Sequence, residues 1–120
     1  MYGKAGRIMI LVLGGMASGK RTYVQSLGYA PTDMDVSLES DAPVLLSLED
    51  TLLQGPLTEA DLERIMRKDV IVCSEVGLGV VPVDANKRAW RELVGRTCCM
   101  LAAKATRVVR MVCGIPVELK

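Results

Sequence analysis

A stretch of nine residues has the types and spacing of a phosphate-binding loop. The apolar run from Ile8 to Leu13 leads directly into glycine, and a Gly-Lys pair follows after four residues, giving G-x-x-x-x-G-K between a buried strand and a helix. Glycines let backbone N–H groups turn toward an anion, and the lysine would reach the terminal phosphates as a point charge. The alternative is a glycine-rich turn without a ligand. We predict nucleotide phosphate binding by Gly14, Gly15, Met16, Ala17, Ser18, Gly19, Lys20, Arg21 and Thr22.

The position after the loop lysine departs from this pattern. A loop that binds Mg²⁺ has Ser or Thr there, whose hydroxyl is a metal ligand, whereas this chain has Arg21. Thr22 comes one residue later, which on a helix turns its side chain by about 100°. The loop therefore indicates phosphate binding more clearly than Mg²⁺-dependent catalysis.

Acidic residues follow two other predicted strands. In a parallel sheet the carboxyl ends of the strands meet at one edge, and ligands bind there. A carboxylate at that edge would hold Mg²⁺ through water or take a proton from an attacking hydroxyl. We predict catalytic roles for Lys20 and Glu75, and Mg²⁺ binding by Glu49 and Asp50. The alternative for Glu75 is a surface acid just past the end of a strand.

Composition narrows the class of protein. The chain has 120 residues, of which 50% are hydrophobic, and a formal net charge of +1. This length favours one domain over residues 1–120, and the near-neutral charge gives no support for binding to nucleic acid. No apolar run is long enough to span a membrane, and the N-terminus lacks the pattern of a signal peptide. We therefore expect a cytoplasmic protein.

The chain contains four cysteines and no histidine. No C-x-x-C pair occurs, which argues against a zinc site, and we interpret the cysteines as buried, inert thiols. The lack of histidine excludes Ser-His and Cys-His nucleophilic pairs, a histidine general base and any covalent nucleotidyl-histidine step on these residues.

Strand and helix patterns alternate along the chain. Segment 29–41 has no periodicity and is predicted to be an exposed loop, whose acids would bind a cation or a substrate hydroxyl, or simply be solvated. The alternation predicts an α/β fold with a mainly parallel sheet of about four or five strands flanked by helices. Predicted strands are 7–13, 42–48, 70–73, 107–113 and a short edge strand 117–119; predicted helices are 20–27, 58–68 and 85–104, the last two capped by Thr58 and Asp84.

Four segments of the chain resemble motifs of one enzyme family. Val70–Pro82 resembles the strand and S-N-E-V-G-x-G-[IV]-V-P motif of the adenosylcobinamide kinase/adenosylcobinamide-phosphate guanylyltransferase family of cobalamin biosynthesis, with Ser74 at the Asn position. Residues 88–96 resemble its R-x-[FW]-R-[DE]-L-x-G-R helix, residues 112–120 its G-[LI]-P-x-x-L-K ending, and residues 13–20 its phosphate loop. The resemblance covers about residues 7–28 and 70–120.

The resemblance implies a P-loop (RecA-like) fold and a homotrimer. Such proteins bind ATP or GTP, phosphorylate the aminopropanol hydroxyl of adenosylcobinamide, and then transfer GMP through a guanylylated histidine. Carried over to this chain, the glycines, Ser18 and Lys20 of the loop would hold the nucleotide phosphates, and Glu75 would lie at the reaction centre.

Three departures qualify this implication. Arg21 replaces the serine after the loop lysine, Ser47 stands where the family has an acidic residue, and segment 29–41 replaces the segment that carries the histidine. Guanylyl transfer by the family mechanism is therefore not expected. Two interpretations remain: a kinase that phosphorylates a cobinamide-type hydroxyl, and a non-catalytic nucleotide-binding or regulatory relative. A small P-loop kinase for an unrelated metabolite fits the glycine motif and the C-terminal motif less well.

Overall fold

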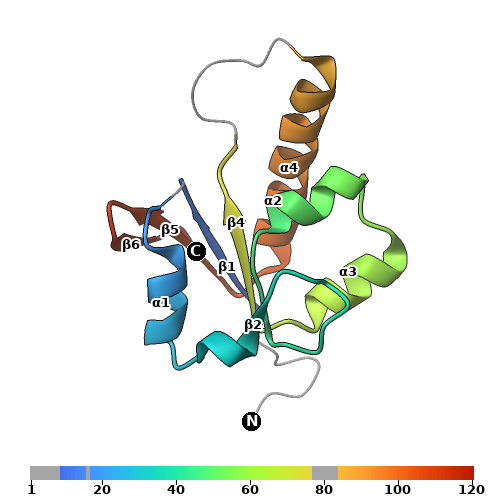
Figure 1. Ribbon diagram of the computed structural model, residues 1–120. Coiled ribbons are helices and arrows are strands. Elements are labelled where there is room, and N and C mark those ends of the chain that lie inside the picture. The colour runs from blue at the N-terminus through green and yellow to red at the C-terminus, as the bar shows by residue number, and fades with distance from the viewer. Residues whose placement is uncertain (1–8, 16, 77–83) are drawn as a thin grey trace.

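The computed structural model describes residues 9–15, 17–76 and 84–120, and its centre is a six-stranded sheet in the order β2-β3-β4-β1-β5-β6 (Figure 1). Adjacent strands from β2 to β5 run parallel, and β6 pairs antiparallel with β5. The strands are β1 (Ile10–Gly14), β2 (Met34–Asp35), β3 (Val44–Leu45), β4 (Val70–Ser74), β5 (Arg107–Val112) and β6 (Ile115–Glu118). The helices are α1 (Lys20–Ser26), η1 (Pro31–Asp33), α2 (Leu48–Thr51), η2 (Leu52–Gln54), α3 (Glu59–Met66) and α4 (Ala85–Lys104).

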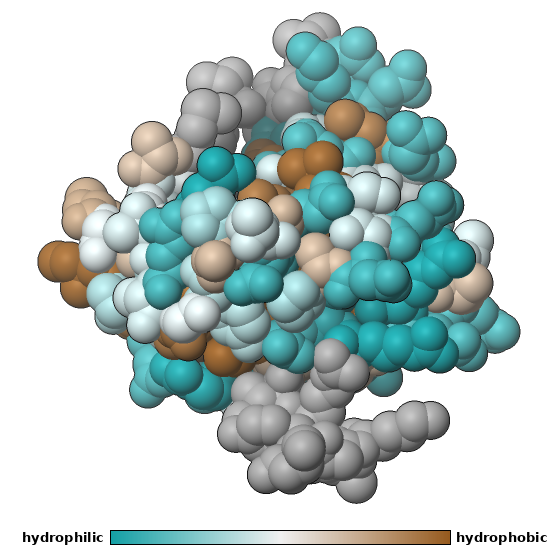
Figure 2. Space-filling model, turned by 60° about the horizontal axis from the view of Figure 1, so that its bottom comes forward, coloured by the Kyte–Doolittle hydropathy of each residue, from teal (hydrophilic) through white to brown (hydrophobic). Residues whose placement is uncertain are grey.

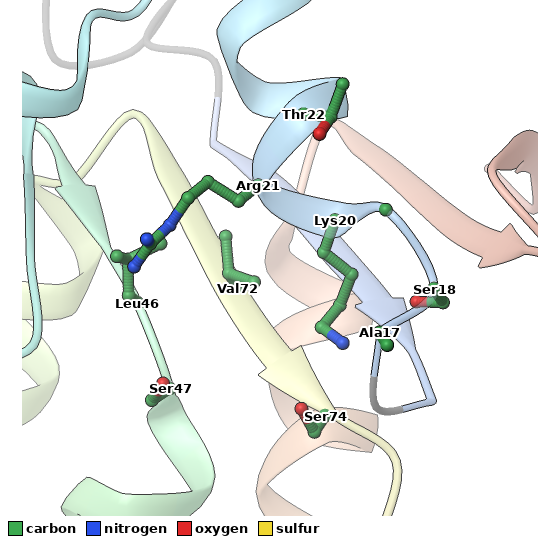
Figure 3. Close-up of a pocket in the computed structure, with 10 residues that line it drawn as sticks. Ala17, Ser18, Lys20, Arg21, Thr22, Leu46, Ser47, Val72 and Ser74 are labelled. Atoms are coloured by element: carbon green, nitrogen blue, oxygen red, sulfur yellow. The ribbon is translucent and has the colours of Figure 1, made fainter.

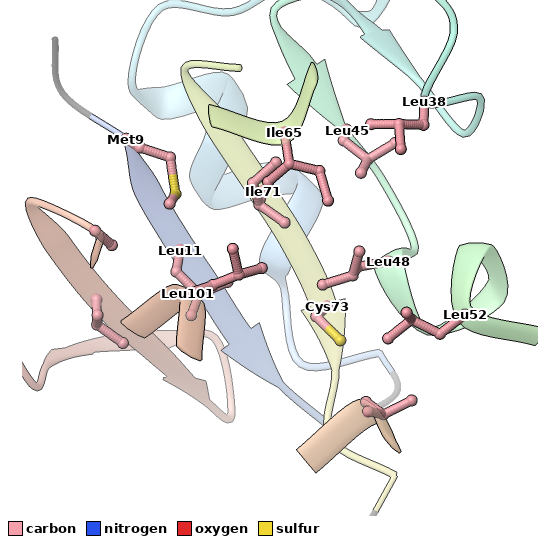
Figure 4. Packing of buried hydrophobic residues seen from close by; sticks show 13 residues of the cluster. Met9, Leu11, Leu38, Leu45, Leu48, Leu52, Ile65, Ile71, Cys73 and Leu101 are labelled. Carbon is pink, nitrogen blue, oxygen red and sulfur yellow. The ribbon is translucent and has the colours of Figure 1, made fainter. Parts of the chain in front are cut away.

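Helices cover both faces of the sheet, which confirms the predicted α/β fold. One face of the strands packs against α1 through Val24, whereas the other packs against α2, α3 and α4 (Figure 4). Alternate residues of a strand point to opposite faces. In β1, for example, Leu11 belongs to the α4 side and Val12 to the α1 side, and neither is exposed to solvent. Because both faces of the sheet are buried, the sequences of its central strands are continuous apolar runs.

The predicted helix starts after Thr58 and Asp84 are confirmed. Thr58 Oγ1 accepts a hydrogen bond from the Asp61 N–H at 3.1 Å, and Asp61 returns the bond to the Thr58 N–H at 3.1 Å. Asp84 Oδ1 accepts from the backbone N–H groups of residues 86 and 87 at the start of α4. These side chains satisfy amide groups that the first turn of a helix leaves without partners.

The second predicted strand, 42–48, is shorter than expected. Only Val44–Leu45 form β3, because Ser47 adopts a left-handed conformation with φ 58° and Leu48 begins α2. Leu48 and Leu52 are buried in the core on the α4 side of the sheet. A run of leucines fits a buried strand and a buried helix equally well, which explains the error.

Segment 29–41, predicted to be a loop, contains η1 and the edge strand β2. Its acids make local contacts: Asp33 accepts a bond from the Ala30 N–H, and Asp35 accepts one from the Ser37 N–H. The bonds to Asp35, above all the Ser37 amide, lower the pKa of its carboxyl. Among the described residues no group of three or more His, Cys, Asp or Glu side chains is arranged to hold a metal.

Two of the four cysteines are not buried, contrary to the prediction. Cys73 is buried and Cys98 is half-buried, but Cys99 and Cys113 are exposed. Cys99 lies on the outer side of α4. Cys113 lies just past the end of β5, in the turn to β6, with a φ of 51°. The apolar run 107–113 predicted that Cys113 is a strand residue, because the run does not show where the strand ends and the turn begins.

The face shown in Figure 2 is mostly hydrophilic, with apolar residues at its left edge, on the side where Figure 1 places β6, and others near its upper middle. Four exposed apolar residues lie on or beside the β5–β6 hairpin: Val112, Ile115, Val117 and Leu119. Within the described part of the chain, no helix has both the length and the apolar character that a membrane crossing requires.

Lys68, two residues after α3, binds the segment that precedes β3. Its Nζ donates to the carbonyl oxygens of Ser40 and Ala42 at 2.6 and 2.5 Å, and only 5% of the residue is exposed. Burial lowers the pKa of this ammonium group, whereas the charges of Asp41 and Asp35 act in the opposite direction.

We expect Lys68→Met to destabilise the fold by about 1–3 kcal/mol, because two carbonyl groups lose their donor. Urea denaturation should show a lower midpoint with an unchanged slope. Arg67→Met, at the exposed neighbouring position, is the control and should change the free energy of unfolding by no more than about 0.5 kcal/mol. Equal effects of the two substitutions would contradict this role of Lys68.

Candidate functional site

The predicted phosphate loop connects β1 to α1 at the carboxyl edge of the sheet. β1 ends at Gly14, and Gly19 precedes α1 with a φ of +91°, a conformation that favours glycine. Lys20 Nζ donates to the Gly15 carbonyl oxygen at 2.6 Å, so the side chain folds back over the loop. Met16 lies outside the described residues.

The turn between β5 and β6 packs against this loop. The Gly114 N–H donates to the Ser18 carbonyl oxygen at 3.0 Å, and a Cβ on Gly19 would lie 3.3 Å from the Gly114 Cα. A Cβ on Gly14 would lie 2.4 Å from Ser18 Oγ and 3.0 Å from the Met111 carbonyl oxygen. The loop therefore requires glycine at position 14 because strand β5 and its own Ser18 leave no room.

A pocket of about 460 Å³ opens beside the loop (Figure 3). The loop contributes two cations, Lys20 and Arg21, and Figure 3 shows the hydroxyls of Ser47 and Ser74 on the far side. The described residues that line the pocket include no Asp or Glu. They are Ala17, Ser18, Gly19, Lys20, Arg21, Thr22, Leu46, Ser47, Val72 and Ser74.

Arg21 and Thr22 point in different directions. Figure 3 shows the Arg21 side chain extending past Val72 toward Leu46, away from the Lys20 ammonium. Thr22 lies near the top of Figure 3, away from Ser47 and Ser74 at the bottom. The pocket therefore presents two separated positive charges, an arrangement suited to a polyanion.

Glu49 and Asp50, the predicted magnesium ligands, do not line this pocket. Glu49 Oε1 accepts a hydrogen bond from the Ser74 N–H at 3.0 Å, and the Glu49 carbonyl oxygen accepts one from Trp90 Nε1 at 2.8 Å. Asp50 is exposed on α2. Mg²⁺ sites usually include one or two carboxylates, so the described lining does not fit a protein-bound magnesium ion.

Glu75 lies in a neighbouring pocket of about 400 Å³. Its backbone N–H donates to the Gly14 carbonyl oxygen at 2.9 Å, whereas its carboxylate forms a two-point ion pair with Arg110, at 2.9 and 3.0 Å. Ser74 lines both pockets and so connects them. The second pocket is lined by Leu13, Ser74, Glu75, Val76, Arg91, Val94, Gly95, Cys98 and Arg110.

The structure thus brings together most of the predicted loop residues but separates them from the predicted acids. Residues 17–22 line one pocket, Glu75 lines the other, and Glu49 supports the strand end between them. The sequence analysis missed Arg110, which pairs with the predicted catalytic acid. The available signal was its position as a charged residue within the apolar run 107–113, although its side chain is 43% exposed.

Comparisons with known proteins agree with the fold and the motifs. Residues 53–119 match the model of the family described as cobinamide kinase / cobinamide phosphate guanyltransferase. The chain is 41% identical over 61 residues to the bifunctional adenosylcobalamin biosynthesis protein CobU of Escherichia coli (strain K12), and equally to that of Salmonella typhimurium (strain LT2). Each match covers 51% of this chain and 34% of the relative. The phosphate loop lies outside the residues that the family model matches.

We expect Gly14→Ala to destabilise the protein by about 1–3 kcal/mol, because the new methyl group would overlap Ser18 Oγ and crowd strand β5. Gly15→Ala is the matched control, since a Cβ there meets nothing within 4 Å. Chemical unfolding of both variants measures the difference. Similar stabilities for the two would show that Ser18 and strand β5 do not crowd position 14 as described.

Proposed function

Because the chain belongs to the cobinamide kinase / cobinamide phosphate guanyltransferase family, we propose that it binds the triphosphate of GTP or ATP at the loop and transfers the γ-phosphoryl group to a cobinamide-type hydroxyl. The observation that carries this proposal is the pocket beside the loop, which is lined by the cations Lys20 and Arg21 and by the hydroxyl residues Ser47 and Ser74. The proposed reaction class is that of a kinase acting on an alcohol, and adenosylcobinamide is the proposed acceptor.

Phosphoryl transfer depends mainly on positioning and on neutralising charge. In this proposal Lys20 binds the terminal phosphates. Arg21 neutralises part of the phosphate charge that a metal ion helps to neutralise in other P-loop enzymes. The described lining offers Mg²⁺ no carboxylate, so most of the protein's charge compensation falls on these two cations. Glu75 would orient the acceptor hydroxyl, since its ion pair with Arg110 holds the carboxylate in one orientation.

The guanylyl step is not part of the proposal. That step needs a histidine in the family, and none of the 120 residues is histidine. Assembly into a homotrimer and a cytoplasmic location remain predictions from the resemblance and the composition. Light scattering of the purified protein would test the trimer.

A second candidate function is nucleotide binding without catalysis. One observation favours it: no Asp or Glu is among the described residues of the loop pocket, and Glu75 lies in the neighbouring pocket. Such a protein would bind the nucleotide through Lys20 and show no turnover with adenosylcobinamide. The turnover assays below distinguish the two candidates.

We expect Lys20→Ala to weaken GTP and ATP binding about tenfold to a hundredfold, because a charge-assisted contact to phosphate contributes roughly 1.5–3 kcal/mol. Titration calorimetry measures both nucleotides. Lys104→Ala, at an exposed position in the last turn of α4, removes the same charge and should leave affinity unchanged. An equal loss in both variants would indicate a nonspecific charge effect.

We expect Arg21→Ser to lower phosphoryl transfer to adenosylcobinamide by about tenfold or more, because the substitution removes one of the two cations that neutralise phosphate charge in this proposal. Turnover is measured with and without Mg²⁺. A variant as active as the wild type, or more active, with or without Mg²⁺ would contradict this role of Arg21. No turnover in either the wild type or the variant would favour the non-catalytic candidate.

We expect Glu75→Gln to lower turnover by about a hundredfold while nucleotide affinity stays within about twofold, because the carboxylate lies outside the loop pocket. Glu92→Gln, an exposed position on α4, is the control. If Glu75→Gln weakened nucleotide binding as much as turnover, its proposed role toward the acceptor hydroxyl would be wrong.

A further inference from the structure

Two thiols from different elements meet on the α4 side of the sheet. Cys73, near the end of β4, and Cys98, in the middle of α4, place their Sγ atoms 3.6 Å apart. The proposed function uses neither thiol. We propose that this pair is an oxidation site, at which a hydroperoxide converts the two thiols into a reversible disulfide between β4 and α4. The inference does not depend on nucleotide binding.

The two thiols differ in access. Cys73 is fully buried and belongs to the core shown in Figure 4, where it projects from β4 beside Leu48. Cys98 is half-buried and lines the pocket that contains Glu75 and Arg110. A small oxidant that enters this pocket meets Cys98 first, with Cys73 directly behind it.

The hydrogen bond between the thiols also makes them unequally reactive. In the structure Cys98 Sγ donates to Cys73 Sγ. The bond lowers the pKa of Cys98, because the Cys73 S–H donates in turn once Cys98 loses its proton, although burial acts in the opposite direction. The pKa of Cys73 is raised by the same bond and by burial. Thiolates are the reactive form of cysteine, so Cys98 is the attacking group and Cys73 the resolving group.

The chemistry balances in two steps. The Cys98 thiolate attacks one oxygen of the hydroperoxide, the O–O bond breaks, and the leaving alkoxide takes up a proton as alcohol, or as water when the oxidant is hydrogen peroxide. Cys98 is now a sulfenic acid. The sulfur of Cys73 then attacks the sulfur of Cys98, the S–O bond breaks, and the hydroxyl leaves as water with the Cys73 proton. Two thiols lose two electrons, which the peroxide accepts.

Forming the bond requires only a small movement. A disulfide has a sulfur–sulfur distance of about 2.0 Å, so the two side chains must approach by about 1.5 Å from their present separation. The bond would join α4 to the strand end that continues into Ser74 and Glu75. Oxidation would therefore fix one wall of the Glu75 pocket to the sheet.

Peptide mapping of the oxidised protein tests the proposal. Folded Cys99→Ser protein is treated with hydrogen peroxide, its remaining thiols are alkylated in denaturant, and it is digested with trypsin. The substitution is needed because residues 98 and 99 share the tryptic peptide 97–104, whereas Cys73 lies in peptide 69–87. We expect these two peptides to be joined, with a mass lower by two hydrogen atoms, and to separate after treatment with dithiothreitol.

Two further samples make the result decisive. Adding Cys73→Ser should remove the cross-link and leave a sulfenic acid on Cys98 that dimedone traps. Wild-type protein, mapped in the same way, should lose two of its four thiols even if a variant folds poorly, and peptides 69–87 and 97–104 should be joined with one alkylated thiol left in the second peptide. The proposal is overturned if both peptides are recovered alkylated after oxidation, or if Cys98 is oxidised only to sulfinic acid while Cys73 stays free.

Discussion

The close contact between the loop after β1 and the turn after β5 is the constraint on which the candidate site depends. Gly14 lies against Ser18 and strand β5 with no room for a side chain, and the Gly114 amide donates to the Ser18 carbonyl oxygen. Parallel pairing of β1 with β4 and β5 brings these segments to one edge of the sheet. The contact fixes the loop backbone and therefore the position from which the Lys20 side chain extends. A precise phosphate site therefore depends on residues separated by most of the chain.

Charge around this edge is divided between two pockets that meet at Ser74. The loop pocket has two cations and, among its described residues, no carboxylate. The nearby carboxylates have other partners, since Glu49 accepts a hydrogen bond from the Ser74 amide and Glu75 pairs with Arg110. This separation supports phosphate binding in one pocket and contact with an acceptor group in the other.

Local signals in the sequence predicted the parts of the structure that local interactions determine. The phosphate-loop spacing located the turn from β1 to α1, and the side chains of Thr58 and Asp84 marked two helix starts because they bond to nearby amides. β3 was predicted too long and α2 was missed, since the leucine run around residue 46 carries no period that separates strand from helix. The short strand β2 was missed because segment 29–41 has no periodicity. The Glu75–Arg110 pair could not be predicted because it joins residues 35 positions apart, and only the strand register places them together.

Displacement of GTP by inorganic tripolyphosphate tests the central claim most directly, because the claim is that the loop pocket recognises phosphates. Calorimetric titration of GTP into wild-type protein is repeated in Mg²⁺-free buffer at rising tripolyphosphate concentration. We predict that tripolyphosphate binds, lowers the apparent GTP affinity in proportion to its concentration, and loses both effects in Lys20→Ala. GTP binding that saturating tripolyphosphate leaves unchanged would contradict this account of the pocket.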